Sequence, residues 1–116
     1  MDIYHVWCNL CPGVSDLDFT EDVRRYLGHL EDEGRLSSYR LTRRKLGLGP
    51  HSLGEFHIAM EFRDLAHLDG AFRKVARRAD PVESFHHAMS SKVTDVTFAL
   101  YRDFPEATRE LGGAPR

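Results

Sequence analysis

The stretch that decides the fold is Glu55-Phe56-His57-Ile58-Ala59-Met60-Glu61-Phe62. Successive side chains of a β-strand point to opposite faces of a sheet, so this alternation predicts a half-buried strand. The apolar face carries Phe56, Ile58, Met60 and Phe62, and the mixed face carries Glu55, His57, Ala59 and Glu61. Such a sheet packs helices on its apolar face and leaves the other to water, a partner or a ligand.

The flanking sequence supplies the other elements of an α+β domain. Alternation predicts strands over residues 2–10, 36–46 and 93–101. Apolar residues at three- and four-residue steps predict two main helices, with the stripes Phe19, Val23, Tyr26, Leu27 and Leu30, and Leu65, Leu68, Phe72, Val75 and Ala76. We interpret both stripes as core. Ser15 or Asp18 caps the first helix, Gly34 ends it, Asp64 caps the second, and a short third helix follows Asp80-Pro81.

The order of these elements predicts the topology. It is β-α-β-β-α-β, with an extra helix before the last strand. With right-handed crossovers, this order gives the ferredoxin-like arrangement, an antiparallel sheet with both main helices on one face. We expect a single domain over residues 1–105, followed by a C-terminal tail, 106–116, that is weakly helical and then disordered.

Composition excludes several classes of function. The 116 residues are 41% hydrophobic and 29% charged, with a formal net charge of −2, so no overall basic field attracts nucleic acid. The basic run Arg40–Lys45 alternates between two faces of a strand, which divides its charge. No apolar run approaches the length of about 20 residues that a spanning helix needs. We therefore predict a cytoplasmic protein that binds neither nucleic acid nor membrane.

The face opposite the helices carries the candidate site residues. It takes side chains from all four predicted strands, namely Ile3, His5, Trp7, Asn9, Arg40, Thr42, Arg44, Glu55, His57, Glu61, Asp95, Thr97 and Tyr101. The first and third strands are adjacent in this fold, so His5 or Trp7 should lie near His57. A tryptophan rarely stays fully exposed in a monomer. We therefore expect a second copy of the chain to cover this face.

Four segments carry a resemblance to a known family. They are residues 3–10, 39–46, 54–58 and 98–105, and they resemble a small bacterial family of uncharacterised proteins. That family is placed with the dimeric α+β barrels, which include cofactor-free antibiotic-biosynthesis monooxygenases and stress-responsive barrel proteins. The resemblance covers about residues 1–105. It implies a homodimer whose two sheets face each other and line an enclosed space, but it assigns no catalytic residue.

A small hydrophobic or aromatic molecule between the two sheets is the preferred functional hypothesis. Trp7 and Tyr101 would stack on it, and His5 and Arg40 would supply polar contacts. If a reaction occurs, His57 is the candidate base, oriented by Glu55 or Glu61, in a cofactor-free oxygenation or isomerisation. The alternative is a non-catalytic assembly module whose polar face is a filled interface.

Other patterns have simpler interpretations. We assign no cofactor and no metal ligands, although His5, His57 and a carboxylate leave a metal site as a third alternative. Cys8 and Cys11 form a lone C-x-x-C, which we interpret as one buried residue and one loop thiol rather than a redox or metal pair. His86 and His87 are adjacent on a helix, where neighbours point about 100° apart and seldom bind one ion together.

Overall fold

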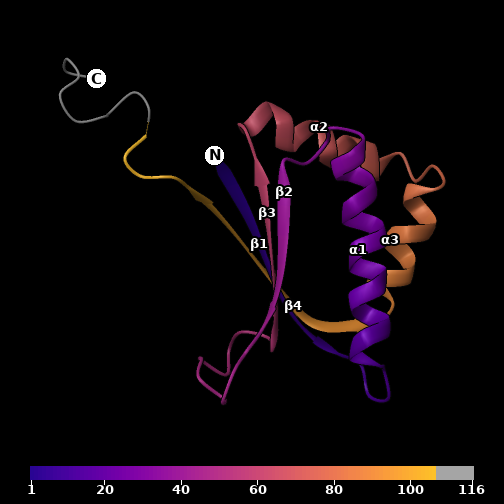
Figure 1. Cartoon of the computed structure of the whole chain (residues 1–116), viewed down its shortest axis with the longest axis vertical. Helices are drawn as coiled ribbons and strands as arrows, with labels where there is room; N and C mark the ends of the chain where they lie inside the picture. Colours follow the sequence, from indigo (N-terminus) through magenta and orange to yellow (C-terminus); the bar gives the residue numbers. More distant parts are fainter. Residues whose placement is uncertain (107–116) are drawn as a thin grey trace.

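The computed structural model describes residues 1–106 as a four-stranded antiparallel sheet with three helices on one side (Figure 1). The elements are β1 (Asp2–Leu10), α1 (Asp16–Asp32), β2 (Ser38–Arg43), β3 (Phe56–Phe62), α2 (Leu65–Ala76), α3 (Val82–Ser90) and β4 (Val93–Arg102). The strand order is β2-β3-β1-β4. This is the ferredoxin-like arrangement that the sequence predicts. The proposed tail, apart from residue 106, lies outside the described residues.

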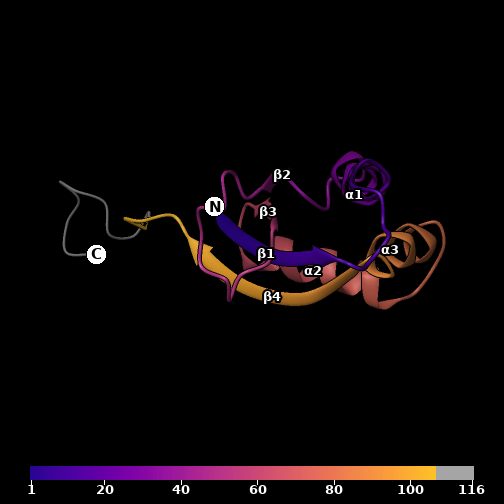
Figure 2. The same cartoon turned by 90° about the horizontal axis from the view of Figure 1, so that it is seen from below.

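The strand register fixes which side chains share a face. Trp7 pairs with His57 of β3 and with Thr97 of β4, and Thr42 of β2 pairs with His57. Directly paired residues of antiparallel strands lie on the same face. These four side chains therefore form one row across the face without helices, which we call the open face. Figure 2 gives the perpendicular view, in which β1 and β4 curve alongside each other, α1 and α3 lie toward the right, and α2 overlaps the strands.

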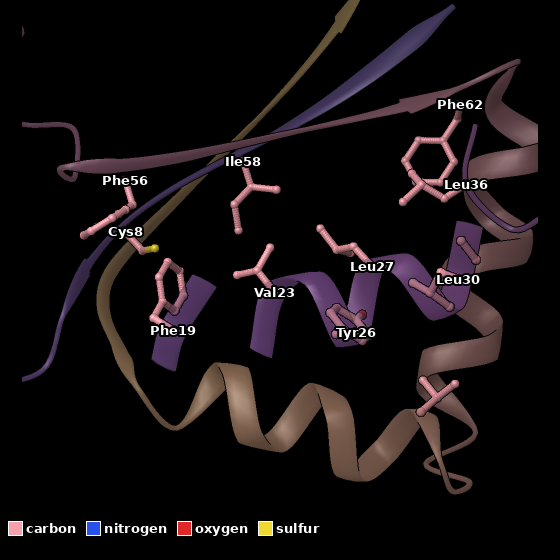
Figure 3. Packing of buried hydrophobic residues seen from close by; sticks show 12 residues of the cluster. Cys8, Phe19, Val23, Tyr26, Leu27, Leu30, Leu36, Phe56, Ile58 and Phe62 are labelled. Carbon is pink, nitrogen blue, oxygen red and sulfur yellow. The ribbon is translucent and has the colours of Figure 1, made fainter. Parts of the chain in front are cut away.

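The filled part of the core lies between α1 and the sheet (Figure 3). The predicted α1 stripe is fully confirmed, because Phe19, Val23, Tyr26, Leu27 and Leu30 are all buried. They pack against a sheet layer that includes Cys8, Phe56, Ile58 and Phe62. The Ser15 hydroxyl accepts a hydrogen bond from the Asp18 amide, so Ser15 is the N-cap of α1.

Gly54, in the loop before β3, has to be a glycine because it lies against the backbone of β1. A Cβ at Gly54 would lie 2.4–2.5 Å from the backbone carbon, nitrogen and oxygen of Cys8. No side chain fits there, and the neighbouring atoms are backbone that cannot turn away. The close approach also brings the Glu55 amide within 2.8 Å of the Asn9 side-chain oxygen, which accepts its hydrogen bond.

The structure corrects two expectations, and it leaves a large apolar residue of β4 exposed. β2 spans only residues 38–43; beyond it the Arg44 amide still donates to the Glu55 carbonyl, while the Arg44 guanidinium donates to the carbonyls of Pro50 and Leu53 in the following loop. The α2 stripe is not filled core, since Phe72 is 45% exposed and only Ala71 of that helix is buried. Phe98 of β4 lies on the helix-facing side but is 61% exposed, because β4 is an edge strand. No helix within residues 1–106 is long and apolar enough to cross a membrane.

Candidate functional site

Two histidines and the tryptophan form a stacked cluster at the centre of the open face. His5 Nδ1 lies 2.8 Å from His57 Nε2, and the two rings are nearly parallel with centroids 5.1 Å apart. The Trp7 ring stacks on His57 at 4.8 Å and on His5 at 5.5 Å. The prediction that His5 or Trp7 lies near His57 is confirmed, and the structure brings both of them to it. They come from β1 and β3, which the register places side by side.

Tyr101 and Thr42 extend this cluster on either side. The Tyr101 ring meets His5 edge to face at 5.0 Å, and its side chain is 61% exposed. The Thr42 hydroxyl lies 3.4 Å from His57 Nδ1. Arg40 is exposed and pairs in register with Ala59, so it belongs to the open face without touching the stacked rings. Four of the five predicted site residues therefore lie together.

Two sets of tautomers satisfy the hydrogen bonds of the pair: either His57 Nδ1–H donates to the Thr42 hydroxyl, or that hydroxyl donates to His57 Nδ1 and His57 Nε2–H donates to His5 Nδ1. If His57 Nδ1–H donates to Thr42, then His57 Nε2 accepts from His5 Nδ1–H. His5 Nε2 then carries a lone pair, and it has no partner among residues 1–106. The nitrogen available to a ligand or to a partner is thus on His5. Both ring nitrogens of His57, the predicted base, already have neighbours.

Burial shifts the protonation of both rings in the same direction. It lowers the pKa of His5, and it lowers the pKa of His57, which the nearby His5 lowers further. At pH 7, a larger fraction of each ring is therefore neutral than in a free histidine. Two protonated rings would also bring two N–H groups together at 2.8 Å, so the hydrogen bond breaks when both are charged.

The carboxylates expected to orient the histidines interact with other side chains instead. Glu55 pairs with Arg43, which also reaches Asp16 of α1. Glu61 accepts a hydrogen bond from the Ser38 hydroxyl at 2.9 Å. The hydroxyl of Thr42 occupies the orienting position, so the expectation that Glu55 or Glu61 would do so is wrong. Glu55 also falls just before β3, whose first residue is Phe56.

The cysteines and the third helix lie away from the open face. Cys8 and Cys11 are both free, and burial raises the pKa of the Cys8 thiol to about 11, so it stays protonated. Within residues 1–106, no group of three or more His, Cys, Asp or Glu side chains is arranged to hold a metal ion. His86 packs edge to face on Tyr26 at 5.3 Å, which places it on the opposite side of the sheet from His57.

A large apolar cavity lies on the helix side of the sheet. Its volume is about 630 Å³, within the range of small-molecule sites. β1 and β3 form its floor with Tyr4, Val6, Ile58 and Met60. The walls come from all three helices and β4, through residues that include Phe19, Phe72, Val75, Met89 and Phe98. The lining residues within the described part of the chain include no Asp, Glu, Lys or Arg.

The predicted site residues do not line this cavity. His5, Trp7, Arg40, His57 and Tyr101 all lie on the open face, one sheet thickness away. The molecule thus offers two surfaces of different chemistry. One is an aromatic and imidazole cluster on the open face, and the other is an apolar cavity beneath the helices.

Comparison with known families identifies the chain. Its sequence matches a family of unknown function (DUF6614) over residues 1–114. The chain belongs to this family. The match supports the resemblance noted from the sequence. A comparison with functionally curated proteins gives no match to this member of DUF6614.

Solved structures share the fold of this DUF6614 member at low sequence identity. The Arabidopsis thaliana protein At3g17210 superposes with a TM-score of 0.72 at 12% identity, covering 92% of this chain and 99% of that one. An antibiotic biosynthesis monooxygenase gives 0.62 at 17% identity, covering 90% and 100%. A dimeric ferredoxin-like protein of unknown function from Jannaschia sp. CCS1 gives 0.62 at 15% identity, covering 89% and 100%. These likenesses establish the fold alone.

Sequence reasoning missed the cavity in this DUF6614 chain because a helical stripe looks the same whether it meets filled core or empty space. Phe72, Val75 and Ala76 have the spacing of core residues, yet they form one wall of the cavity. A signal was available in the short third helix. It adds His86 and Ser90, two polar residues, to the side that faces the sheet.

Proposed function

We propose that this protein is a homodimer that binds a small apolar molecule in the cavity between its sheet and its helices. The observation that carries the proposal is the cavity itself, with a volume of about 630 Å³ and an apolar, uncharged lining. The cavity is partly open to solvent, so its apolar lining, which includes the partly exposed Phe72 and Phe98 rings, contacts water in the free protein. An apolar ligand would cover these groups and remove that surface from water.

The open face is the proposed dimer interface. It presents Trp7 and Tyr101, residue types that are enriched in protein interfaces. It also presents the His5–His57 pair, a hydrogen-bonded polar group that would define how two sheets register on each other. The structural relatives from Jannaschia and from Thermobifida fusca are described as dimeric, which supports the same state here. In this arrangement the ligand site and the interface use opposite faces of one sheet.

Dye binding with a blocked cavity tests the proposal. Nile red is uncharged, and its emission moves to the blue in apolar surroundings. The wild-type protein should bind it. Ala76→Trp should weaken binding about tenfold, because an indole at this lining position occupies part of the cavity, and fitting the dye beside it adds an overpacking cost of about 1–3 kcal/mol. Ala66→Trp, on the same helix but away from the cavity, is the matched control and should bind normally. Absence of dye binding by the wild-type protein would favour a purely structural assembly module.

A second candidate function is acid–base catalysis on the open face, in a space between the two sheets. The favouring observation is the short His5–His57 hydrogen bond, stacked under Trp7 and backed by Thr42. In the tautomer set in which His57 Nδ1–H donates to Thr42, His5 Nε2 is the atom positioned to take a proton from a carbon acid and return it, as an isomerase does. His57 then positions His5, while Trp7, Arg40 and Tyr101 contact the substrate.

Matched histidine variants separate this second candidate from an interface role. His5→Gln should abolish turnover of a carbon acid, and His57→Gln should shift its pH profile while the dimer persists. If ligand titrations of the wild-type protein leave the His5, Trp7 and His57 signals unmoved, the open face has no ligand and its histidines serve the interface.

A further inference from the structure

Among residues 1–106, Tyr26 is the one buried residue with a polar side chain in the cavity lining, since Tyr4, His86 and Ser90 are partly exposed. Tyr26 of α1 is only 8% exposed, and its hydroxyl has no hydrogen-bond partner among residues 1–106. The hydroxyl oxygen is not enclosed by protein atoms, so it opens into the cavity, where water or a ligand accepts its hydrogen bond. The neighbour at the ring is His86, whose imidazole meets the Tyr26 ring edge to face rather than through its hydroxyl.

The surroundings of the Tyr26 hydroxyl also disfavour its ionisation. Burial raises the pKa of Tyr26 to about 12, and the nearby Tyr4 raises it further, so the phenol stays protonated throughout the physiological range. It is therefore a fixed O–H donor inside an apolar cavity. The cavity residues of the described chain include no Asp, Glu, Lys or Arg, and the imidazole of His86 is the single group there that can carry a positive charge, so the cavity offers little to neutralise a charged ligand.

From these two observations we propose that Tyr26 sets the ligand class: an uncharged, largely apolar molecule that carries a hydrogen-bond acceptor, such as a ketone, at the end that meets the Tyr26 hydroxyl. This inference rests on the proposed cavity function and adds its chemistry. The acceptor receives the O–H of Tyr26, while the apolar part of the ligand fills the space between Met60, Phe72 and Phe98. Anions and cations are disfavoured because they would lose their hydration inside a lining that includes no Asp, Glu, Lys or Arg among the described residues.

A matched pair of ligands tests this assignment. 2-Acetylnaphthalene and 2-ethylnaphthalene have nearly the same shape, but only the first has a carbonyl acceptor. In Tyr26→Phe, the affinity for the ketone should fall about 2- to 10-fold, the range expected for the net loss of one hydrogen bond, and the affinity for the hydrocarbon should not fall. Naphthalene-2-carboxylate, an anion of similar size, should bind neither protein. Calorimetry or displacement of Nile red measures all three ligands.

Stability provides an independent readout. Because the Tyr26 hydroxyl has no protein partner, removing it should leave the thermal midpoint of the ligand-free protein unchanged or raise it. If the hydroxyl instead had a structural role, its removal would lower the thermal midpoint of the ligand-free protein. Tyr39→Phe, which removes a phenolic hydroxyl outside the cavity lining, is the control and should change the affinity for neither ligand.

The outcomes distinguish the inference from the function on which it rests. If the wild-type protein binds neither naphthalene nor Nile red, the cavity function fails and the inference fails with it. If both naphthalenes bind and Tyr26→Phe alters neither, the cavity function stands but the role of Tyr26 is overturned. A variant that loses both ligands equally also overturns it, because the effect is then one of packing. Tight binding of the carboxylate would overturn the exclusion of charge.

Discussion

Replacing Trp7 by alanine should dissociate the proposed dimer while the protomer stays folded. The Trp7 ring contacts the rings of His57 and His5 on the open face, and it takes no part in the core between α1 and the sheet. Each lost aromatic contact costs the protomer about 0.5–1.5 kcal/mol beyond the area buried. At the centre of an interface, a tryptophan truncated to alanine costs about 2–4 kcal/mol of binding free energy.

That loss corresponds to an increase of about 30- to 700-fold in the dimer dissociation constant. Sedimentation velocity over a dilution series measures the constant, and far-ultraviolet circular dichroism verifies that the variant is folded. Leu17→Ala is the control, because Leu17 is 77% exposed on α1 and lies on the helix side. A wild-type protein that sediments as a monomer at micromolar concentration refutes the reasoning, as does a Trp7→Ala dimer of unchanged affinity.

Two further predictions concern stability. The pKa values of His5 and His57 lie below the ordinary value of 6.5 in the folded protein, so the unfolded chain binds more protons near that pH. The free energy of unfolding should therefore be steady above about pH 7.5 and decrease as the pH falls through 6.5. Thermal melts from pH 8 to 5.5 measure this dependence. In the double variant His5→Gln/His57→Gln, stability should depend less on pH than in the wild-type protein. An equal slope in both proteins would contradict the assignment. Gly54→Ala should lower the free energy of unfolding by about 1–3 kcal/mol, because its Cβ meets the Cys8 backbone at 2.4–2.5 Å. Chemical denaturation measures it, with Gly28→Ala, where a Cβ meets no atom within 4 Å, expected to be harmless.

The fold was predictable because its signals are local and repeated. Alternation in Phe56–Phe62 and the stripe from Phe19 to Leu30 each determine a buried face without reference to the rest of the chain. The pairing of His5 and Trp7 with His57 then followed from the strand order alone. Hydrophobic periodicity, together with topology, was enough to bring distant residues together on the open face.

The cavity was not predictable for a physical reason. Periodicity states which side of a helix is apolar, but it does not state how far that side lies from the sheet. Phe72 and Phe98 have the pattern of core residues, yet they surround space. The role of Thr42 was also missed, because the partner of a histidine is determined by side-chain distances that a sequence pattern does not contain.

The position of a bound ligand tests the account most directly. Titrating 2-acetylnaphthalene into isotope-labelled protein and following the methyl and indole resonances assigns the binding face in one experiment. The account predicts shifts at Val6, Met60 and Met89, which line the cavity, with the Trp7 indole N–H unmoved. Shifts at Trp7 together with unmoved cavity methyls would place the ligand between the sheets and contradict the assignment of the helix-side cavity as the binding site.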